Sequence, residues 1–455
     1  MGFGRNGQTI SSTQYTDCYC STNESQRRSD ITGNESSSDD EREARAGINP
    51  QCSVRMPLCV ICTSHLADTM SSITSARLVR CPPRWLLMRI ETDDGLVGWG
   101  EAIGDLHEEV EAGLAAASER IIGEDSNDLN RIVDRLMRGR FWRDGPVLNT
   151  VASAVEMALW DLKGKRLDVP VWQLLGGKVR DKVLVYRNLW GASPTEFADS
   201  ARAALSEGLK AMKVSPAGPT TAIASDADLQ GIVEVVRAVR EAVGPEVKVA
   251  VDLHGRLSPA AARRLMPLLS EFDPWFIEEP CLPDDSSALR LIDSDLPLAT
   301  GERLLTLNQF RQHLEPPCID VIQPDISLVG GISGAMLIGQ MASMSQVSLA
   351  PHCPYGPVQT AASLQVAAAS SAHQMQEVQS LGGAGLPGGR SGGGWAWSFN
   401  LLKHPFIVED GYVAVPEGAG LGIEVDEELI AEHMDEWNPH PPPMWTHSDG
   451  AFAEW

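Results

Sequence analysis

Three carboxylates recur in the second half of the chain at a nearly constant interval, each at the end of an apolar, strand-like run. Asp252 closes VKVAVD, Glu278 follows in PWFIEE after 26 residues, and Glu302 ends LPLATGE after another 24. This interval fits one strand, one helix and two loops, which is the repeat of a parallel β/α fold. Because the carboxyl ends of such strands meet at one mouth of a barrel, we expect the three acids to lie together.

Three neighbouring carboxylates repel one another unless a cation lies between them. Mg2+ is the usual cation in such sites, because it accepts carboxylate oxygens together with water or substrate oxygens in an octahedron. A single acid after a strand is more often a helix cap or a solvated loop charge. Three in series favour a metal site, so Asp252, Glu278 and Glu302 are predicted to bind Mg2+.

The charge of the 455-residue chain limits its partners. A net charge of −24 and a pI near 4.8 argue against binding to nucleic acid or to an anionic membrane surface. No apolar run approaches the ~20 residues of a membrane-spanning helix. The apolar patch MPLCVIC at 56–62 is too short and too late for a secretory signal. We therefore expect a cytoplasmic protein that acts on a small molecule.

Residues 1–69 differ in composition from the rest of the chain. They are polar, poor in aromatic residues and without hydrophobic periodicity, which is typical of disorder. We expect a disordered extension, with Met70 as a candidate native start. Cys59 and Cys62 form a CxxC pair, but no second pair follows at zinc-finger spacing. Incidental cysteines are therefore favoured over a metal or redox site.

Residues 70–182 predict an α+β capping domain. A strand is followed by a β-hairpin with a turn at Asp94 and Gly95, and then by helical periodicity. The helical patterns cover 107–122, 126–139 and 149–165.

Residues 183–399 predict an α/β (β/α)7β-type TIM barrel, because apolar strand-like runs alternate there with amphipathic helical patterns. An open doubly wound sheet is the alternative, since the first and last strands are the weakest. Residues 400–455 are expected to pack back on the capping domain. The eight candidate strands are 183–188, 211–215, 247–252, 275–279, 296–300, 319–324, 346–352 and 374–378.

Two histidines follow candidate strands on the carboxylate side. His254 lies two residues beyond Asp252, and His352 ends QVSLAPH. Asp325, at the end of the preceding strand, is placed to hydrogen-bond to His352 and raise its basicity. A lone histidine is more often structural, but two at strand ends beside three acids favour an acid–base pair. With a cation, such a pair suits removal of a proton next to a carboxylate and loss of a hydroxyl, which is dehydration.

These motifs, in their order, resemble the enolase superfamily. The order is VDLHGR, FIEEP, TGER, QPD, APHCP and QEVQ, after a capping domain. Within the superfamily the chain is similar to the D-galactonate dehydratase branch of the mandelate racemase/muconate lactonizing type. That similarity rests on PPRWLLMRIETDDGLVGWGE at 82–101 and on W-x-H-x-D-G-x-x-x-E-W at 445–455. It covers about residue 72 to 455, except for a glycine-rich stretch at 381–400.

The resemblance implies a role for each polar residue. The three spaced carboxylates would bind Mg2+, and His352, supported by Asp325, would remove the C2 proton of an aldonate. His254 would protonate the departing C3 hydroxyl, and Glu377 would stabilise the enolate oxygen. The product would be a 2-keto-3-deoxy aldonate. The resemblance also implies a homo-oligomer.

The second barrel strand separates the branches of the superfamily. Racemases and several dehydratases carry Lys-x-Lys there, whereas this chain has Lys213 followed by Val214 and Ser215, so a two-base racemase with a second lysine is disfavoured. Lys213 either contacts the substrate carboxylate or is an ion-pair partner inside the barrel. Arg303 and Trp85 are further candidates for substrate binding.

Several functional alternatives stay open at this stage. The same chemistry on gluconate, arabinonate or mannonate is the nearest one, followed by an epimerase and by an inactive relative that only binds. The glycine-rich stretch 381–400 is either a surface loop or a lid that selects the sugar acid.

Overall fold

A computed structural model describes residues 70–379, 401–439 and 444–454 of the chain. The predicted extension 1–69 and the glycine-rich stretch 381–400 lie outside the described residues. Within the described ranges, no helix combines the length and apolar character needed to span a bilayer.

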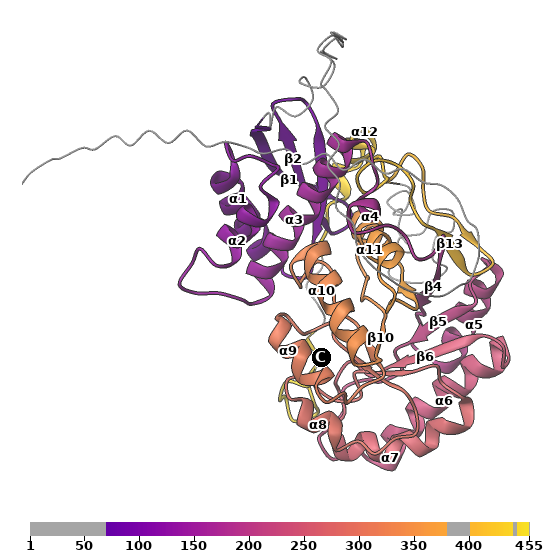
Figure 1. The fold of residues 1–455 in the computed structure, drawn as a ribbon. Helices are drawn as coiled ribbons and strands as arrows, with labels where there is room; N and C mark the ends of the chain where they lie inside the picture. Colours follow the sequence, from indigo (N-terminus) through magenta and orange to yellow (C-terminus); the bar gives the residue numbers. More distant parts are fainter. Residues whose placement is uncertain (1–69, 380–400, 440–443, 455) are drawn as a thin grey trace, which may run out of the picture. The chain divides into compact units, whose positions relative to one another are not determined.

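The described chain begins with a three-stranded antiparallel sheet covered by helices (Figure 1). The turn between the second and third strands contains Gly95 with a φ of +81°, a left-handed conformation that glycine adopts without strain. Side chains at Gly98 or Gly100 would collide with the backbone of α3, so these glycines let that helix lie close to the sheet. The elements are β1 (Ile73–Cys81), β2 (Trp85–Thr92), β3 (Val97–Ala102), α1 (His107–Ile121), α2 (Leu129–Met137), α3 (Pro146–Leu167) and α4 (Val171–Leu174).

Eight parallel strands then form a closed barrel. Neighbouring strands pair in chain order from β4 to β10. The last strand, β11, pairs with the first, with Gln376 opposite Val185, and a bridge joins Leu349 of β10 to His373 just before β11. The predicted barrel is therefore confirmed, and the open-sheet alternative is wrong. The strands are β4 (Lys182–Asn188), β5 (Ala211–Val214), β6 (Lys248–Asp252), β7 (Ile277–Glu278), β8 (Leu298–Thr300), β9 (Val321–Ile322), β10 (Ser348–Leu349) and β11 (Gln376–Glu377).

Helices connect successive barrel strands, and their first residues explain where several of them begin. Ser193 and Ser258 each accept a backbone N–H bond and are each followed by proline, a residue whose fixed φ suits the first helical position. Ser225 and Asp228 form a reciprocal capping box at the start of α6, the helix between these two. The helices are α5 (Pro194–Ser206), α6 (Asp226–Val243), α7 (Pro259–Leu269), η1 (Ser270–Phe272), α8 (Ser286–Arg290), α9 (Leu307–Leu314), α10 (Gly331–Met344) and α11 (Pro357–Ala369).

The inside of the barrel is filled by side chains. Each strand, or the residue next to it, contributes one buried residue to a single cluster. Four alanines share this cluster with larger aromatic and aliphatic side chains, so the interior is packed. The cluster consists of Tyr186, Ala211, Ala250, Phe276, Ala299, Val321, Ala350 and Met375.

The segment after residue 400 contacts both the barrel and the capping region. Its strand β13 pairs antiparallel with β4 of the barrel. Glu427, on its helix α12, forms ion pairs with Arg77 and Arg89 of the capping sheet. The elements are β12 (Val408–Glu409), β13 (Tyr412–Ala414), α12 (Glu427–Glu432) and η3 (Met434–Glu436).

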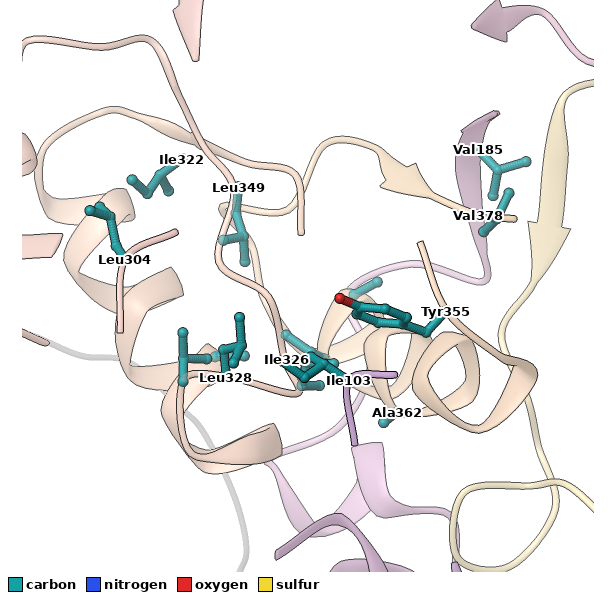
Figure 2. Packing of buried hydrophobic residues seen from close by; sticks show 14 of the residues in the cluster. Ile103, Val185, Leu304, Ile322, Ile326, Leu328, Leu349, Tyr355, Ala362 and Val378 are labelled. Carbon is teal, nitrogen blue, oxygen red and sulfur yellow. The ribbon is translucent and has the colours of Figure 1, made fainter. Parts of the chain in front are cut away.

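One continuous hydrophobic core joins the capping region to the barrel. Figure 2 shows part of it, with Ile103 from the end of the capping sheet drawn beside Ile326 from the loop after β9 and Tyr355 from the loop after β10. The capping sheet packs directly on these loops, because Ser327 Oγ donates to the carbonyl of Glu101 at 3.0 Å and the backbone N–H of Gly356 donates to the Glu101 side chain.

Candidate active site

The three spaced carboxylates meet at the carboxyl ends of β6, β7 and β8. Asp252 ends β6, Glu278 ends β7, and Glu302 lies two residues beyond β8. One oxygen from each lies within 4.8 Å of the others, and all three residues are buried. Burial and the neighbouring Asp252 raise the pKa of Glu278 well above its usual range. The sequence-predicted cluster is thus assembled, and its oxygens and spacing could hold a hard divalent cation.

Lys213 extends from β5 into the same cluster and is 1 % exposed. Its Nζ lies 2.8 Å from Glu278 Oε1, 3.2 Å from Glu377 Oε1 and 3.3 Å from Asp252 Oδ2. Although burial disfavours its charge, these carboxylates raise the pKa of Lys213 well above its ordinary value. The ion-pair role considered for Lys213 is therefore present in the structure, and it places a fixed positive charge among the acids.

Two further residues hold the carboxylates in place. Gln323 Nε2 donates to Glu278 Oε2 at 2.7 Å. Arg303 Nε lies 2.9 Å from Glu279 Oε2 and 3.6 Å from Glu302 Oε1, and its Nη2 donates to the carbonyl of His254 at 2.8 Å. Arg303 is therefore engaged by a buried carboxylate and by the backbone at the site.

His352 and Asp325 form the predicted pair at the ends of β10 and β9. His352 Nδ1 lies 2.8 Å from Asp325 Oδ2, and His352 Nε2 lies 3.4 Å from Glu302 Oε2. Burial works against the charged imidazole, but Glu302 and the hydrogen bond to Asp325 raise the pKa of His352 to about 10. The pKa of Glu302 shifts in the other direction. Burial would raise this pKa, but the charges of His352 and His254 outweigh burial and lower it to about 2.

His254 reaches the same cluster from the loop after β6. Its Nε2 lies 3.3 Å from Asp252 Oδ2, and its backbone N–H donates to Asp252 Oδ1 at 2.9 Å. The backbone has a φ of +49°, which lets the ring turn back toward the carboxylates. Burial lowers the pKa of His254 despite its acidic neighbours.

Glu377 and Trp85 lie in different surroundings. Glu377 ends β11, is fully buried, and accepts a hydrogen bond from the backbone N–H of Cys353 at 3.1 Å. Together with its contact to Lys213, this joins Glu377 to the site. Trp85, at the start of β2, is 4 % exposed and belongs to the hydrophobic core, so its described packing is that of a core residue.

Several polar residues of the site were missed in the sequence. Gln323 lies two residues before Asp325 in QPD, so strand alternation could have placed its side chain on the carboxylate side. The buried Glu101, Glu156 and Gln359 gave no such signal. Each also has partners that lie far away along the sequence, in segments that only the folded chain brings together.

Comparison with known families covers most of the chain. Residues 64–176 match the N-terminal domain of mandelate racemase/muconate lactonizing enzyme, and residues 196–429 match the family described as enolase C-terminal domain-like. D-galactonate dehydratases from Ralstonia pickettii (strain 12J) and Cronobacter sakazakii (strain ATCC BAA-894) are each 36 % identical over 391 residues. These alignments span 84 % of this chain and 100 % of either relative.

Solved structures give the same result. An enolase from Agrobacterium radiobacter, bound to Na and L-malate, has a TM-score of 0.75 at 29 % identity, covering 84 % of this chain and 99 % of that one. A mandelate racemase/muconate lactonizing enzyme from Sulfitobacter sp. has a TM-score of 0.74 at 28 % identity, covering 85 % and 100 %. The capping sheet and the closed barrel agree with these matches. The chain belongs to the mandelate racemase/muconate lactonizing enzyme family of the enolase superfamily.

Proposed function

We propose that the protein is a Mg2+-dependent dehydratase that converts an aldonate into a 2-keto-3-deoxy aldonate and water. D-galactonate is the first candidate substrate, because the relatives that match over their whole length bear the name D-galactonate dehydratase. The observation that carries the proposal is the position of two histidines beside one buried cluster of three carboxylates. His254 lies against Asp252, and His352 lies against Glu302.

The residues at the barrel mouth supply the proton transfers of such a reaction. His352, oriented by Asp325, accepts the proton from C2 at its Nε2, because its Nδ1 is engaged by the carboxylate. His254 donates a proton to the C3 hydroxyl as it leaves. Asp252, Glu278 and Glu302 would hold the cation. When bound, the cation supplies positive charge that favours the enediolate form of the substrate carboxylate.

Lys213 and Glu377 complete this arrangement. Lys213 adds a fixed positive charge beside the carboxylates, where a substrate carboxylate would otherwise meet net negative charge. Glu377 Oε1 lies 3.2 Å from Lys213 Nζ, and Glu377 Oε2 accepts the backbone N–H of Cys353. In this proposal both residues act on the charge that develops on the enolate oxygen, Lys213 through its positive charge and Glu377 by donating a hydrogen bond.

The test is a panel of aldonates incubated with the purified protein and Mg2+, with 2-keto-3-deoxy acids as the measured products. We expect turnover of D-galactonate that EDTA abolishes, that added Mg2+ restores, and that His352→Asn removes. Turnover of gluconate, arabinonate or mannonate instead would keep the reaction and change the substrate. Solvent deuterium at C2 without loss of water would favour an epimerase, and no reaction with any sugar acid would overturn the proposal.

A further inference from the structure

Gln359 lies in the first turn of α11 and is fully buried. Both the nitrogen and the oxygen of its side-chain amide form hydrogen bonds. Nε2 donates to Asp325 Oδ1 at 2.8 Å, and Oε1 accepts the backbone N–H of Tyr355 at 3.2 Å. One side chain thus joins the carboxylate behind His352 to the loop that follows His352.

Asp325 has a different partner for each of its oxygens. Oδ1 accepts from Gln359 Nε2 and from the backbone N–H of Ser327, at 2.7 Å for the latter. Oδ2 faces His352 Nδ1 at 2.8 Å. Because the two donors on Oδ1 fix the rotation of the carboxylate, Oδ2 stays in line with the imidazole. Donors to a carboxylate also favour its charged form.

The same turn of α11 is held by the capping region. The backbone N–H of Gln359 donates to Glu101 Oε2 at 2.9 Å, and that of Gly356 donates to Glu101 Oε1 at 2.5 Å. A Cβ at position 356 would lie 2.5 Å from the same oxygen, so the glycine leaves room for this close approach. Glu101 therefore fixes the backbone that carries the Gln359 side chain, from β3 of the capping sheet.

We propose that Gln359 is a positioning residue for the proton acceptor of the reaction, an inference that rests on the proposed function. It acts through Asp325, whose carboxylate it holds in the orientation that leaves His352 Nε2 facing the substrate. Through Glu101, it makes the geometry of His352 depend on docking of the capping sheet.

The experiment compares Gln359→Met with Gln365→Met. Gln365 lies on the same helix and is equally buried, and its amide also uses both ends: it accepts from Trp172 N at 2.8 Å and donates to Leu421 O at 3.0 Å. Methionine keeps a similar volume in both variants but removes the amide. We expect kcat of Gln359→Met to fall about 10- to 100-fold with KM nearly unchanged, a loss typical of removing groups that orient a functional side chain. We expect Gln365→Met to keep kcat after correction for folded protein.

A second readout does not need turnover. In histidine-labelled full-length protein, the Nδ1–H signal of His352 reports its hydrogen bond to Asp325, and His352→Asn identifies that signal. We expect it to shift or broaden in Gln359→Met and to stay in place in Gln365→Met. Gln359→Asn, which withdraws the amide by one methylene, replaces the methionine variant if that protein does not fold, with the same expected changes.

The outcomes separate the two proposals. Equal kcat losses in the Gln359 and Gln365 variants, or an unchanged His352 signal in Gln359→Met, would overturn the positioning role. If the unmodified protein turns over no aldonate, the proposed reaction fails. The position of the His352 signal then still decides whether Gln359 controls the pair.

Discussion

The two sides of the barrel mouth hold the same residue type in opposite electrostatic settings. On one side, His352 lies between Asp325 and Glu302, and these carboxylates raise its pKa to about 10 against the effect of burial. On the other side, burial lowers the pKa of His254, and the charges of Arg256 and Lys213 act in the same direction. Without substrate, His352 therefore binds a proton more tightly than His254 does.

The two sides are also held by different parts of the molecule. Two buried carboxylates of the capping region accept backbone N–H groups at the starts of successive barrel helices, Glu156 at α10 and Glu101 at α11. These helices follow the strands that end near Asp325 and His352. The His254 side is held within the barrel, where φ is +49° at His254 and +68° at Gly255 and where Arg303 donates to the His254 carbonyl. His352, the proposed proton acceptor, thus depends on the capping region, whereas His254, the proposed donor, depends on the barrel.

Glu302 links the pKa of His352 to the proposed metal site. It is the largest influence that raises the pKa of His352 and also one of the proposed metal ligands. Once its charge is shared with a cation, Glu302 attracts the His352 proton less strongly. A bound cation would therefore lower the pKa of His352 and favour its neutral form, while Asp325 would keep its hydrogen bond to Nδ1.

The largest expected effect comes from removing either histidine. Asn in place of His352 or His254 is expected to lower kcat for dehydration about 10²- to 10⁴-fold, the usual contribution of a general acid or base. Measured in D2O, His352→Asn should show no deuterium at C2 of recovered substrate. His254→Asn should still exchange C2 while forming little product, because only expulsion of the hydroxyl is blocked. The reverse pattern would exchange the roles of the two sides.

The sequence predicts the barrel and the carboxylate cluster well, because both depend on local patterns. Strand-end acids at a regular interval meet at one mouth whatever the details of the loops. The ring of Asp252, Glu278 and Glu302 therefore follows from spacing alone, and the Asp325–His352 contact follows from their positions on adjacent strands.

The sequence does not predict how the two histidines are held in place. The loops around His352 are held by contacts across domains, such as Glu101 with the start of α11, which joins residues more than 250 positions apart. His254 depends on a left-handed backbone that a histidine adopts only when the surrounding fold imposes it. Alternation and periodicity carry no information about either.

A smaller effect is expected from Lys213→Met, which acts on the metal ligands between the two histidines. Without Lys213, the buried carboxylates of Glu278, Glu377 and Asp252 lose their shared positive partner. We expect the free energy of unfolding in EDTA to fall by about 3–5 kcal/mol, the cost of breaking a buried ion pair by removing one partner. Urea unfolding with and without Mg2+ measures it, and Mg2+ should restore more stability to the variant than to the unmodified protein. Equal gains from Mg2+ in both proteins would mean that Lys213 and the cation do not share these ligands.

The smallest effect is a pH dependence from Glu156, one of the two capping-region carboxylates that hold the acceptor side. Burial raises its pKa from 4.5 to about 7, although Ser333, Ile332 and Trp160 donate to it. Because the folded protein binds this proton more tightly than the unfolded chain, the contribution is fully present below pH 4.5 and is lost as pH rises through about 7. The loss amounts to about 3 kcal/mol at pH 8.

In Glu156→Gln this dependence disappears, so the stability advantage of the unmodified protein should shrink between pH 5 and pH 8. Urea unfolding at both pH values measures the difference, with Glu119→Gln on the exposed surface of α1 as the control for the change in net charge. If kcat also falls in Glu156→Gln while exchange at C2 slows, the hydrogen bonds of Glu156 to the start of α10 support His352 as those of Glu101 to the start of α11 do. A stability effect without any change in C2 exchange would confine control of His352 to Glu101 and α11.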